Sequence, residues 1–199
     1  MILTGETPFK ILKTHGLIVD ELGEKISKSK GNSQFADPLD LIEGSIKSDG
    51  NRKYGYGLDV LRAWCAFKDS DRNIFVVKEQ LDQVNKEIKL FRDVVRVLLM
   101  NIQTLDINKE VFSFNDLSVI DKHMMTKLLS YCLKITQAYE AFDLKAVYET
   151  TMEFTVRDVV NFYLEFSKHR KQESSTKQVM QRIFQTLLLT SAPVICFSA

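Results

Sequence analysis

The segment LDQVNKEIKLFRDVVRVLLMNI, residues 81–102, carries a continuous helical pattern. Its apolar residues follow one another in alternating steps of three and four, so they share one face of an α-helix of about six turns. These residues are Leu81, Val84, Ile88, Phe91, Val95, Leu98 and Ile102. The spacing predicts a long amphipathic helix that buries this face.

Three more helices are predicted after this one. The same spacing returns from Leu117 to Ala138, with Asn115 or Asp116 as the capping residue. A third helix is predicted from residue 144 to about residue 169, capped by Asp143, and a fourth from near Thr176. The inward face of the third helix is predicted to carry Tyr148, Met152, Val159, Phe162 and Phe166. Short connections between helices of about 20 residues predict an antiparallel bundle.

The first part of the chain has a different character. All eight glycines lie within the first 57 residues, which predicts loops, short strands and short helices there. THGLIVDELGEK, residues 14–25, is typical of a short strand and a turn. DPLDLIEG, residues 37–44, and GLDVLRAWCAF, residues 57–67, are typical of short helices, the first capped by Asp37. The predicted fold class is mainly α, with a short α/β part followed by the helical bundle.

Composition excludes several classes of protein. Lys and Arg number 27 against 26 Asp and Glu, for a net charge of +1, which argues against a polycationic nucleic-acid coat. No apolar run reaches the ~18 residues of a membrane helix. Cys65, Cys132 and Cys196 lack the C-x-x-C spacing of a zinc site, so no metal site is predicted and the thiols are expected to be reduced and in the core. The abrupt beginning and end lead us to expect a piece of a longer protein.

GEKISKSKGN, residues 23–32, is the candidate site for chemistry. It can be an ordinary solvated loop, a thin basic localisation patch or a phosphate-binding loop. Gly23 and Gly31 permit close backbone approach to a ligand, Lys25 and Lys28 supply ammonium groups, and Ser27 and Ser29 supply hydroxyl donors. The spacing differs from that of a P-loop. Taken alone, it leaves the surface loop and the phosphate loop equally open.

The surrounding sequence resolves this ambiguity by resemblance. HGLIVDELGEKISKSKGN, residues 15–32, resembles the K-M-S-K-S signature of class I aminoacyl-tRNA synthetases, with residues 25–29 in the five motif positions and Ile26 in place of methionine. YGYGLDVLRAWCAF, NFYLEFSKHR and SAPVICFSA follow in the order seen in isoleucine-specific members of the family. D-V-L-R at residues 59–62 favours isoleucine over valine enzymes, which usually carry D-A-L-R.

The resemblance implies an organisation and an activity. Residues 1–32 would end the catalytic nucleotide-binding domain, residues 33–75 would form a connecting unit that contacts the stem of the tRNA, and residues 76–199 would form a truncated anticodon-binding bundle. The whole enzyme would be an isoleucine–tRNA ligase that uses ATP, with Mg²⁺ implied by the family. Lys28 would bind ATP and act catalytically with the support of Lys25, while Ser27 and Ser29 would complete the ATP loop.

The same resemblance implies partners and surroundings. The partners would be tRNA(Ile), with ATP and isoleucine held through a catalytic domain that this chain lacks, so the fragment alone is expected to be inactive. A monomer without membrane contact is expected, in the mitochondrial matrix if the source is a eukaryote and otherwise in the cytoplasm. Without the rest of that domain, apolar residues around 10–20 are expected to be exposed.

Several interpretations stay open. Lys168, Arg170, Lys171, Lys177 and Arg182 stand against Glu173 alone, which suits tRNA phosphates but equally a solvated helix end. Asp59 and Arg62 can pair with each other, or Arg62 can reach the catalytic domain. The alternatives for the whole chain are a piece of a valine enzyme, or a non-catalytic helical RNA-binding or interaction module.

Overall fold

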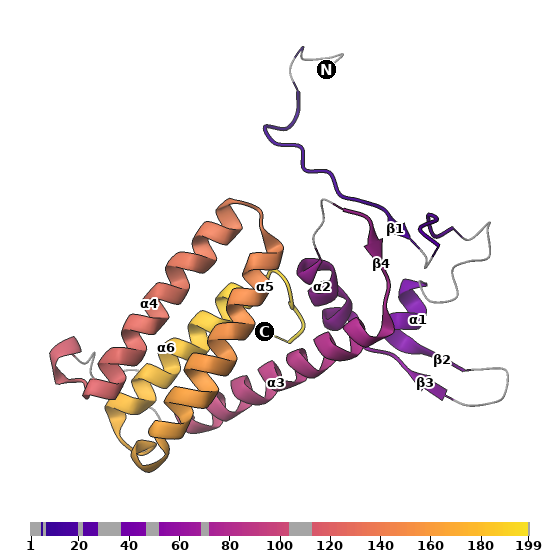
Figure 1. Ribbon diagram of the computed structural model, residues 1–199. Coiled ribbons are helices and arrows are strands. Elements are labelled where there is room, and N and C mark those ends of the chain that lie inside the picture. The colour runs from indigo at the N-terminus through magenta and orange to yellow at the C-terminus, as the bar shows by residue number, and fades with distance from the viewer. Residues whose placement is uncertain are drawn as a thin grey trace.

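The computed structural model describes residues 5, 7–19, 22–27, 37–46, 52–68, 72–103 and 113–198. These parts are mainly helical, with two small sheets near the N-terminal end, as predicted (Figure 1). The strands are β1 (Ile18–Val19), β2 (Gly44–Ile46), β3 (Arg52–Tyr54) and β4 (Ile74–Phe75). The α-helices are α1 (Pro38–Glu43), α2 (Leu58–Phe67), α3 (Lys78–Ile102), α4 (Val119–Glu140), α5 (Leu144–Glu153) and α6 (Ser174–Ser191).

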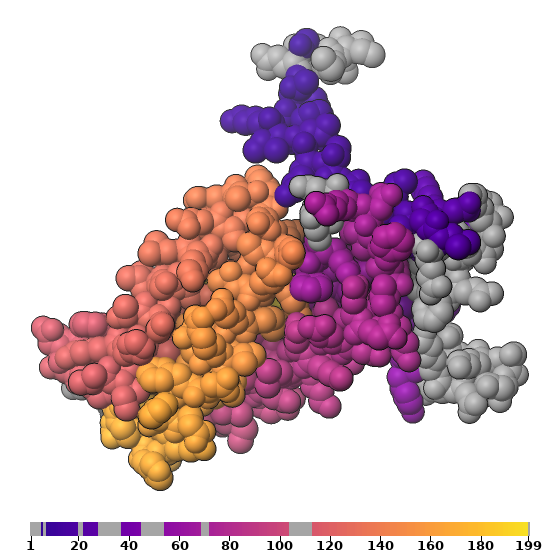
Figure 2. Space-filling view, in the orientation of Figure 1, coloured from indigo at the N-terminus to yellow at the C-terminus, as the bar shows by residue number. Residues whose placement is uncertain are grey.

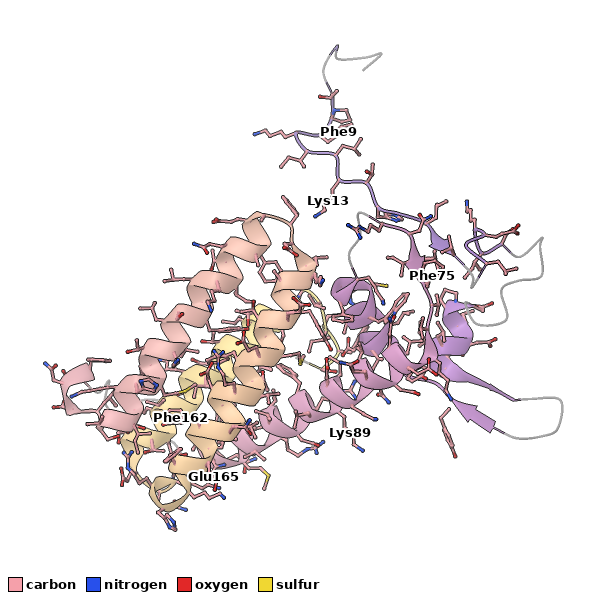
Figure 3. The ribbon with its side chains drawn as sticks, in the orientation of Figure 1. Phe9, Lys13, Phe75, Lys89, Phe162 and Glu165 are labelled. Carbon is pink, nitrogen blue, oxygen red and sulfur yellow. The ribbon has the colours of Figure 1, made fainter. Side chains whose placement is uncertain are left out.

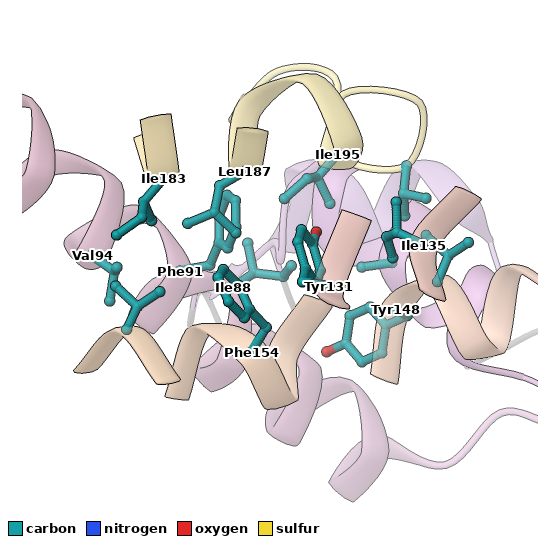
Figure 4. Packing of buried hydrophobic residues seen from close by; sticks show 14 of the residues in the cluster. Ile88, Phe91, Val94, Tyr131, Ile135, Tyr148, Phe154, Ile183, Leu187 and Ile195 are labelled. Atoms are coloured by element: carbon teal, nitrogen blue, oxygen red, sulfur yellow. The ribbon is translucent and has the colours of Figure 1, made fainter. Parts of the chain in front are cut away.

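The bundle is built from α3 to α6, with α2 packed on one end of it. α3 contacts α6, α4 contacts α5 and α6, and α2 contacts both α3 and α5. In the core, Ile88, Phe91 and Val94 of α3 meet Phe154 and Leu187 from the other helices (Figure 4). Burying each such side chain contributes roughly 1.5–3 kcal/mol. The stripe predicted from residue 81 is therefore confirmed as core, except that Val94 is buried where Val95 was expected, and that Val95 and Ile102 are half-buried.

The predicted third helix changes its geometry along its length. α5 continues without a break into a π-helix, η3 (Phe154–Leu164), and the chain then turns through a short 3₁₀-helix, η4 (Lys168–Arg170). A π-helix bonds residues five apart, so its buried face drifts away from one drawn with a period of 3.6. The buried apolar residues of η3 are Phe154, Val159 and Tyr163, whereas Phe166, predicted inward, is 58% exposed. The prediction for Phe166 was wrong for this reason.

The helix caps agree with the sequence in two of three cases. The Asp37 carboxylate accepts from Leu39 N at 3.0 Å at the start of α1. The Asp143 carboxylate accepts from Ala146 N at 2.9 Å at the start of α5. The prediction of Asn115 or Asp116 for α4 was wrong, because both lie in a separate 3₁₀ turn, η2 (Phe114–Asp116), and Ser118 caps the helix instead. α6 begins at residue 174, two residues before the predicted start.

The N-terminal part joins the start of the bundle through a parallel strand pair. β1 pairs with β4, with Ile18 opposite Ile74, and β2 pairs with β3 as a hairpin. The start of the segment before β1 extends away from the bundle (Figure 2), whereas its residues 13–15 lie close to the turn between α4 and α5. Ile11 and Leu12 are 67% and 71% exposed, so the predicted apolar surface is present.

The cysteines differ from the prediction. All three are free thiols, but Cys65 and Cys196 are exposed and Cys132 is half-buried. The prediction of core thiols was therefore wrong: Trp64, not Cys65, is the α2 side chain that enters the core. No helix in the described part of the chain is long and apolar enough to cross a membrane.

Candidate nucleic-acid interface

We call residues 23–32 the lysine loop, and β1 anchors its beginning. Lys25 forms an isolated antiparallel bridge with Val19, and Ile26 N donates to Ile18 O at 3.1 Å. Ile26 is half-buried, which fits its place at the apolar position of the motif, while the Lys25 side chain is exposed. Gly23 lies in the turn between β1 and Lys25 and has a φ of 79°, a conformation that favours glycine. Ser27 is described and half-buried, whereas Lys28 and Ser29 lie outside the described residues.

A close backbone approach fixes the strand that carries the loop. A side chain at Gly16 would collide with the main-chain carbonyl of Arg72, so glycine is required where the N-terminal segment passes the chain leading into β4. Leu17 N also donates to Asn73 Oδ1 at 3.0 Å, and Ile74 N donates to Leu17 O at 2.8 Å. The base of the lysine loop is thus bonded directly to the residues that lead into α3.

Asp59 and Arg62 do not pair with each other, and both bind the C-terminal segment. Arg62 Nε donates to Val194 O at 2.8 Å, and Arg62 Nη2 donates to Pro193 O at 2.7 Å. The buried Asp59 carboxylate accepts from Phe197 N at 3.2 Å and from the Ser198 hydroxyl. We call these contacts of Asp59 and Arg62 with residues 193–198 the α2 clamp. It connects GLDVLRAW to SAPVICFS, two motifs that sequence analysis had singled out separately.

The basic segment 168–182 lies at the other end of the bundle from the N-terminal segment. In Figure 3, Glu165 marks that end and Lys13 marks the opposite one. Lys168 pairs with Glu165 at 2.5 Å on the surface, and Lys177 donates to Gln172 at 3.1 Å. Lys171 is half-buried in the turn before α6, and Arg182 is exposed on α6. All five predicted phosphate contacts, Arg170 included, are exposed or half-buried.

Arg170 is half-buried, and a network that sequence analysis missed holds its guanidinium in place. Its guanidinium donates to Asp121 Oδ2 at 2.7 Å, to Ser118 Oγ at 2.7 Å and to Glu173 Oε2 at 2.7 and 2.9 Å. These carboxylates raise the pKa of Arg170, Glu173 first, so it stays charged. Its predicted contact with tRNA phosphate stays a prediction, but two carboxylates already balance its charge.

Asp121 is the centre of this network and is fully buried. It accepts from Tyr163 Oη at 2.8 Å and from Ser118 Oγ at 2.8 Å, and its own N–H donates to Ser118 Oγ at 3.2 Å. Burial and the bond to Asp121 raise the pKa of Tyr163. The S-V-I-D spacing of residues 118–121 is a variant of the capping box, so a signal was present in the sequence.

Comparison with known proteins gives matches at both ends of the chain. Residues 1–76 match the family model "tRNA synthetases class I (I, L, M and V)", and residues 121–199 match "Anticodon-binding domain of tRNA ligase". The chain belongs to the class I tRNA synthetases. The α2 clamp joins the two matched parts of this class I synthetase chain, because α2 lies in the first part and residues 193–198 lie in the second.

Relatives that align with nearly the whole of this synthetase chain are named isoleucine–tRNA ligase. That of Rippkaea orientalis is 32% identical over 99% of this chain, and that of Caldicellulosiruptor bescii is 32% identical over 98%. That of Gloeobacter violaceus is 33% identical over 92%. The match covers 21%, 21% and 18% of these relatives, so the chain spans about a fifth of their length.

Proposed function

We propose that this chain is the part of an isoleucine–tRNA ligase that carries the ATP loop and the tRNA-binding helices. In the proposed reaction, a carboxylate oxygen of isoleucine attacks the α-phosphorus of ATP, and pyrophosphate leaves as the bond to it breaks. A ribose hydroxyl of the terminal adenosine of tRNA then attacks the carbonyl carbon, and AMP leaves. The observation that carries the proposal is that the lysine loop, the GLDVLRAW segment of α2 and the bundle align in the same order with relatives named isoleucine–tRNA ligase.

The proposed role of the lysine loop is electrostatic. Negative charge builds on the phosphates as pyrophosphate departs, and a fixed ammonium group close to them stabilises that state more than the ground state. Lys28 takes this role with Lys25 in support, and the hydroxyls of Ser27 and Ser29 add hydrogen bonds. The antiparallel bridge at Lys25 and the half-buried Ile26 support this role, because they set where the loop leaves the protein.

ATP is proposed as the nucleotide, with the Mg²⁺ that accompanies it in this family. Within the described residues, no group of three or more His, Cys, Asp or Glu side chains is arranged to hold a metal ion, so we assign no residue to it. The chain is proposed to act as part of a monomer. The compartment remains the one expected from the sequence, the mitochondrial matrix or the cytoplasm.

The proposed tRNA contact is made by the surface cations of the basic segment. Lys168, Lys171, Lys177 and Arg182 would contact backbone phosphates, which positions RNA without reading its bases. Arg170 would hold the turn that presents them, since it is bonded to Asp121 and Glu173.

The test is ATP–pyrophosphate exchange in the full-length synthetase with Lys28→Ala. We expect exchange to slow by orders of magnitude while isoleucine binding changes little, because Lys28 acts on the phosphates. Lys89→Ala on the exposed face of α3 is the matched control and should leave exchange unchanged. Normal exchange in Lys28→Ala would contradict the assignment. Exchange that responds to valine instead of isoleucine would favour the valine enzyme, and no exchange in the unaltered protein would favour the non-catalytic module.

A further inference from the structure

A cavity of about 600 Å³ lies where three distant segments of the chain meet. Its walls come from the N-terminal segment before β1, the C-terminal end of α2 and the turn between α4 and α5. In Figure 3 the labelled Lys13 belongs to the N-terminal wall, above the end of the bundle. The basic segment 168–182 contributes nothing to this cavity, so it is a separate feature of the molecule.

Positive charge collects around this cavity. Lys13, Lys68 and Lys145 line it, one from each of the three segments, and His15 lies beside them. Asp143 is the only carboxylate among the lining residues, all of which the structure describes, and it is already bonded to Ala146 N as the cap of α5. The amino end of α5 faces the same space, and the partial positive charge of a helix start adds to that of the lysines.

The three lysines are only weakly neutralised within the protein. Lys13 Nζ donates to the carbonyl of Phe142 at 2.6 Å, and Lys145 Nζ lies 3.9 Å from Glu149 on the surface. Lys68 donates to the neutral Gln80 and lies 5.7 Å from the ring centroid of Trp64. Burial and then the neighbouring Lys145 lower the pKa of Lys68. A bound anion would relieve the repulsion between the ammonium groups of Lys68 and Lys145.

The turn that forms one wall is held in an unusual conformation. Phe142 has a φ of 53°, which is the left-handed region, and its carbonyl is the acceptor for Lys13. The backbone of this turn therefore brings Lys13 and Lys145 to the same space, from residues 132 apart in the sequence.

We propose that this cavity binds a phosphate group, and that the phosphate belongs to the backbone of the RNA that the bundle binds. The inference rests on the proposed function for the presence of RNA and assigns a phosphate contact to named lysines at the end of the bundle opposite to residues 168–182. Lysines act as point charges and lack the fork that matches a planar group, which suits a phosphodiester held without base recognition. The cavity is lined by residues from both parts of the chain that match a family model, so an RNA bound there would contact both parts.

The test uses the 199-residue chain and a fluorescently labelled tRNA transcript, with binding measured by anisotropy over a range of salt concentrations. Lys145→Gln, and the double variant Lys13→Gln/Lys145→Gln, should weaken binding by about threefold or more at low salt. The salt slope should fall by about one for each phosphate that is no longer neutralised. Lys145→Arg keeps the charge and should restore binding. Lys89→Gln, an exposed lysine on α3, is the matched control and should bind as the unaltered chain does.

Circular dichroism and urea unfolding of each variant establish that the bundle is intact. If Lys13→Gln/Lys145→Gln binds tRNA with the affinity and slope of Lys89→Gln, the cavity proposal is wrong and the proposed function stands. If the unaltered chain binds no tRNA, both fail. Inorganic pyrophosphate, titrated without RNA, is the second arm: binding that depends on Lys145 while tRNA binding does not would assign the cavity to a free phosphate compound and overturn the RNA proposal.

Discussion

The guanidinium of Arg62 donates to the main-chain carbonyl of Val194 across 132 residues, at 2.8 Å. This bond joins the part of the chain that carries the lysine loop to the end of the anticodon-binding match. Together with Asp59 it makes the α2 clamp, whose partners are main-chain groups and one serine. A main-chain acceptor is present whatever the side chain, so the contact depends on the path of residues 193–198 and on the charge of Arg62.

Replacing Arg62 tests this contact. Arg62→Gln removes two charge-assisted hydrogen bonds, and we expect about 1–2 kcal/mol less stability and faster amide exchange at Phe197. Urea unfolding and hydrogen exchange followed by NMR measure the two effects. Arg96→Gln is the matched control, because Arg96 makes an exposed pair with Asp93 and should change stability by less than about 0.5 kcal/mol. Unchanged protection at Phe197 would show that the clamp does not order the segment.

Replacing Asp121 tests the buried network. Asp121→Ala leaves the Tyr163 hydroxyl and the buried side of Arg170 without their acceptor, and we expect about 3–5 kcal/mol less stability. Urea unfolding of the variant measures the loss. Asp93→Ala, an exposed aspartate, should cost little. A loss below about 1 kcal/mol for Asp121→Ala would mean that the network does not hold α4, η3 and η4 together.

The two roles inside the basic segment predict opposite results for neighbouring residues. Lys171→Gln should weaken tRNA binding and lower its salt slope with little change in stability, since Lys171 is proposed to contact phosphate. Arg170→Gln should lower stability, because it breaks the bonds to Asp121 and Glu173. Anisotropy and urea unfolding on the same samples separate the two. Equal stability losses from both variants would contradict this division.

Alkaline pH provides a further test through the tyrosines. Burial, followed by the bond to a carboxylate, raises the pKa of Tyr148 above its ordinary 10.0, and the same causes raise the pKa of Tyr56 to about 12. Above about pH 10 the unfolded chain loses these protons while the folded chain keeps them, so stability falls as pH rises. Tyr148→Phe removes one of these groups. The free energy of unfolding should therefore fall less steeply between about pH 10 and 11, by the slope that corresponds to about one proton.

Unfolding by urea at each pH gives this slope. The unaltered chain, measured over the same range of pH, is the reference. A slope for Tyr148→Phe equal to that of the unaltered chain would contradict the raised pKa.

Periodicity in the sequence predicted the helices well because it reports burial directly. The stripe from Leu81 to Leu98 lies in the core, and the local caps at Asp37 and Asp143 follow from residue type and position. Phe166 was misplaced because nothing in its local spacing reports that η3 takes a wider turn. That wider turn depends on packing against the neighbouring helices.

The candidate site also has features that the sequence predicted and contacts that only the fold shows. The lysine loop was recognised from its own residues together with the order of the motifs around it, and both can be read in the sequence. The partners of Asp59 and Arg62, and the contact of Arg170 with Asp121, could not be predicted, because they come from other segments of the chain, up to 139 residues away for Asp59. The spacing of Ser118 and Asp121 did carry a capping signal, but only the fold shows that Asp121 also binds Tyr163.

Aminoacylation by the full-length synthetase, with isoleucine, valine and leucine offered separately, tests the central claim most directly. We predict that isoleucine is transferred to its tRNA and that valine and leucine give little stable product. Stable charging of a valine tRNA with valine, or no charging by any of the three, would contradict the claim.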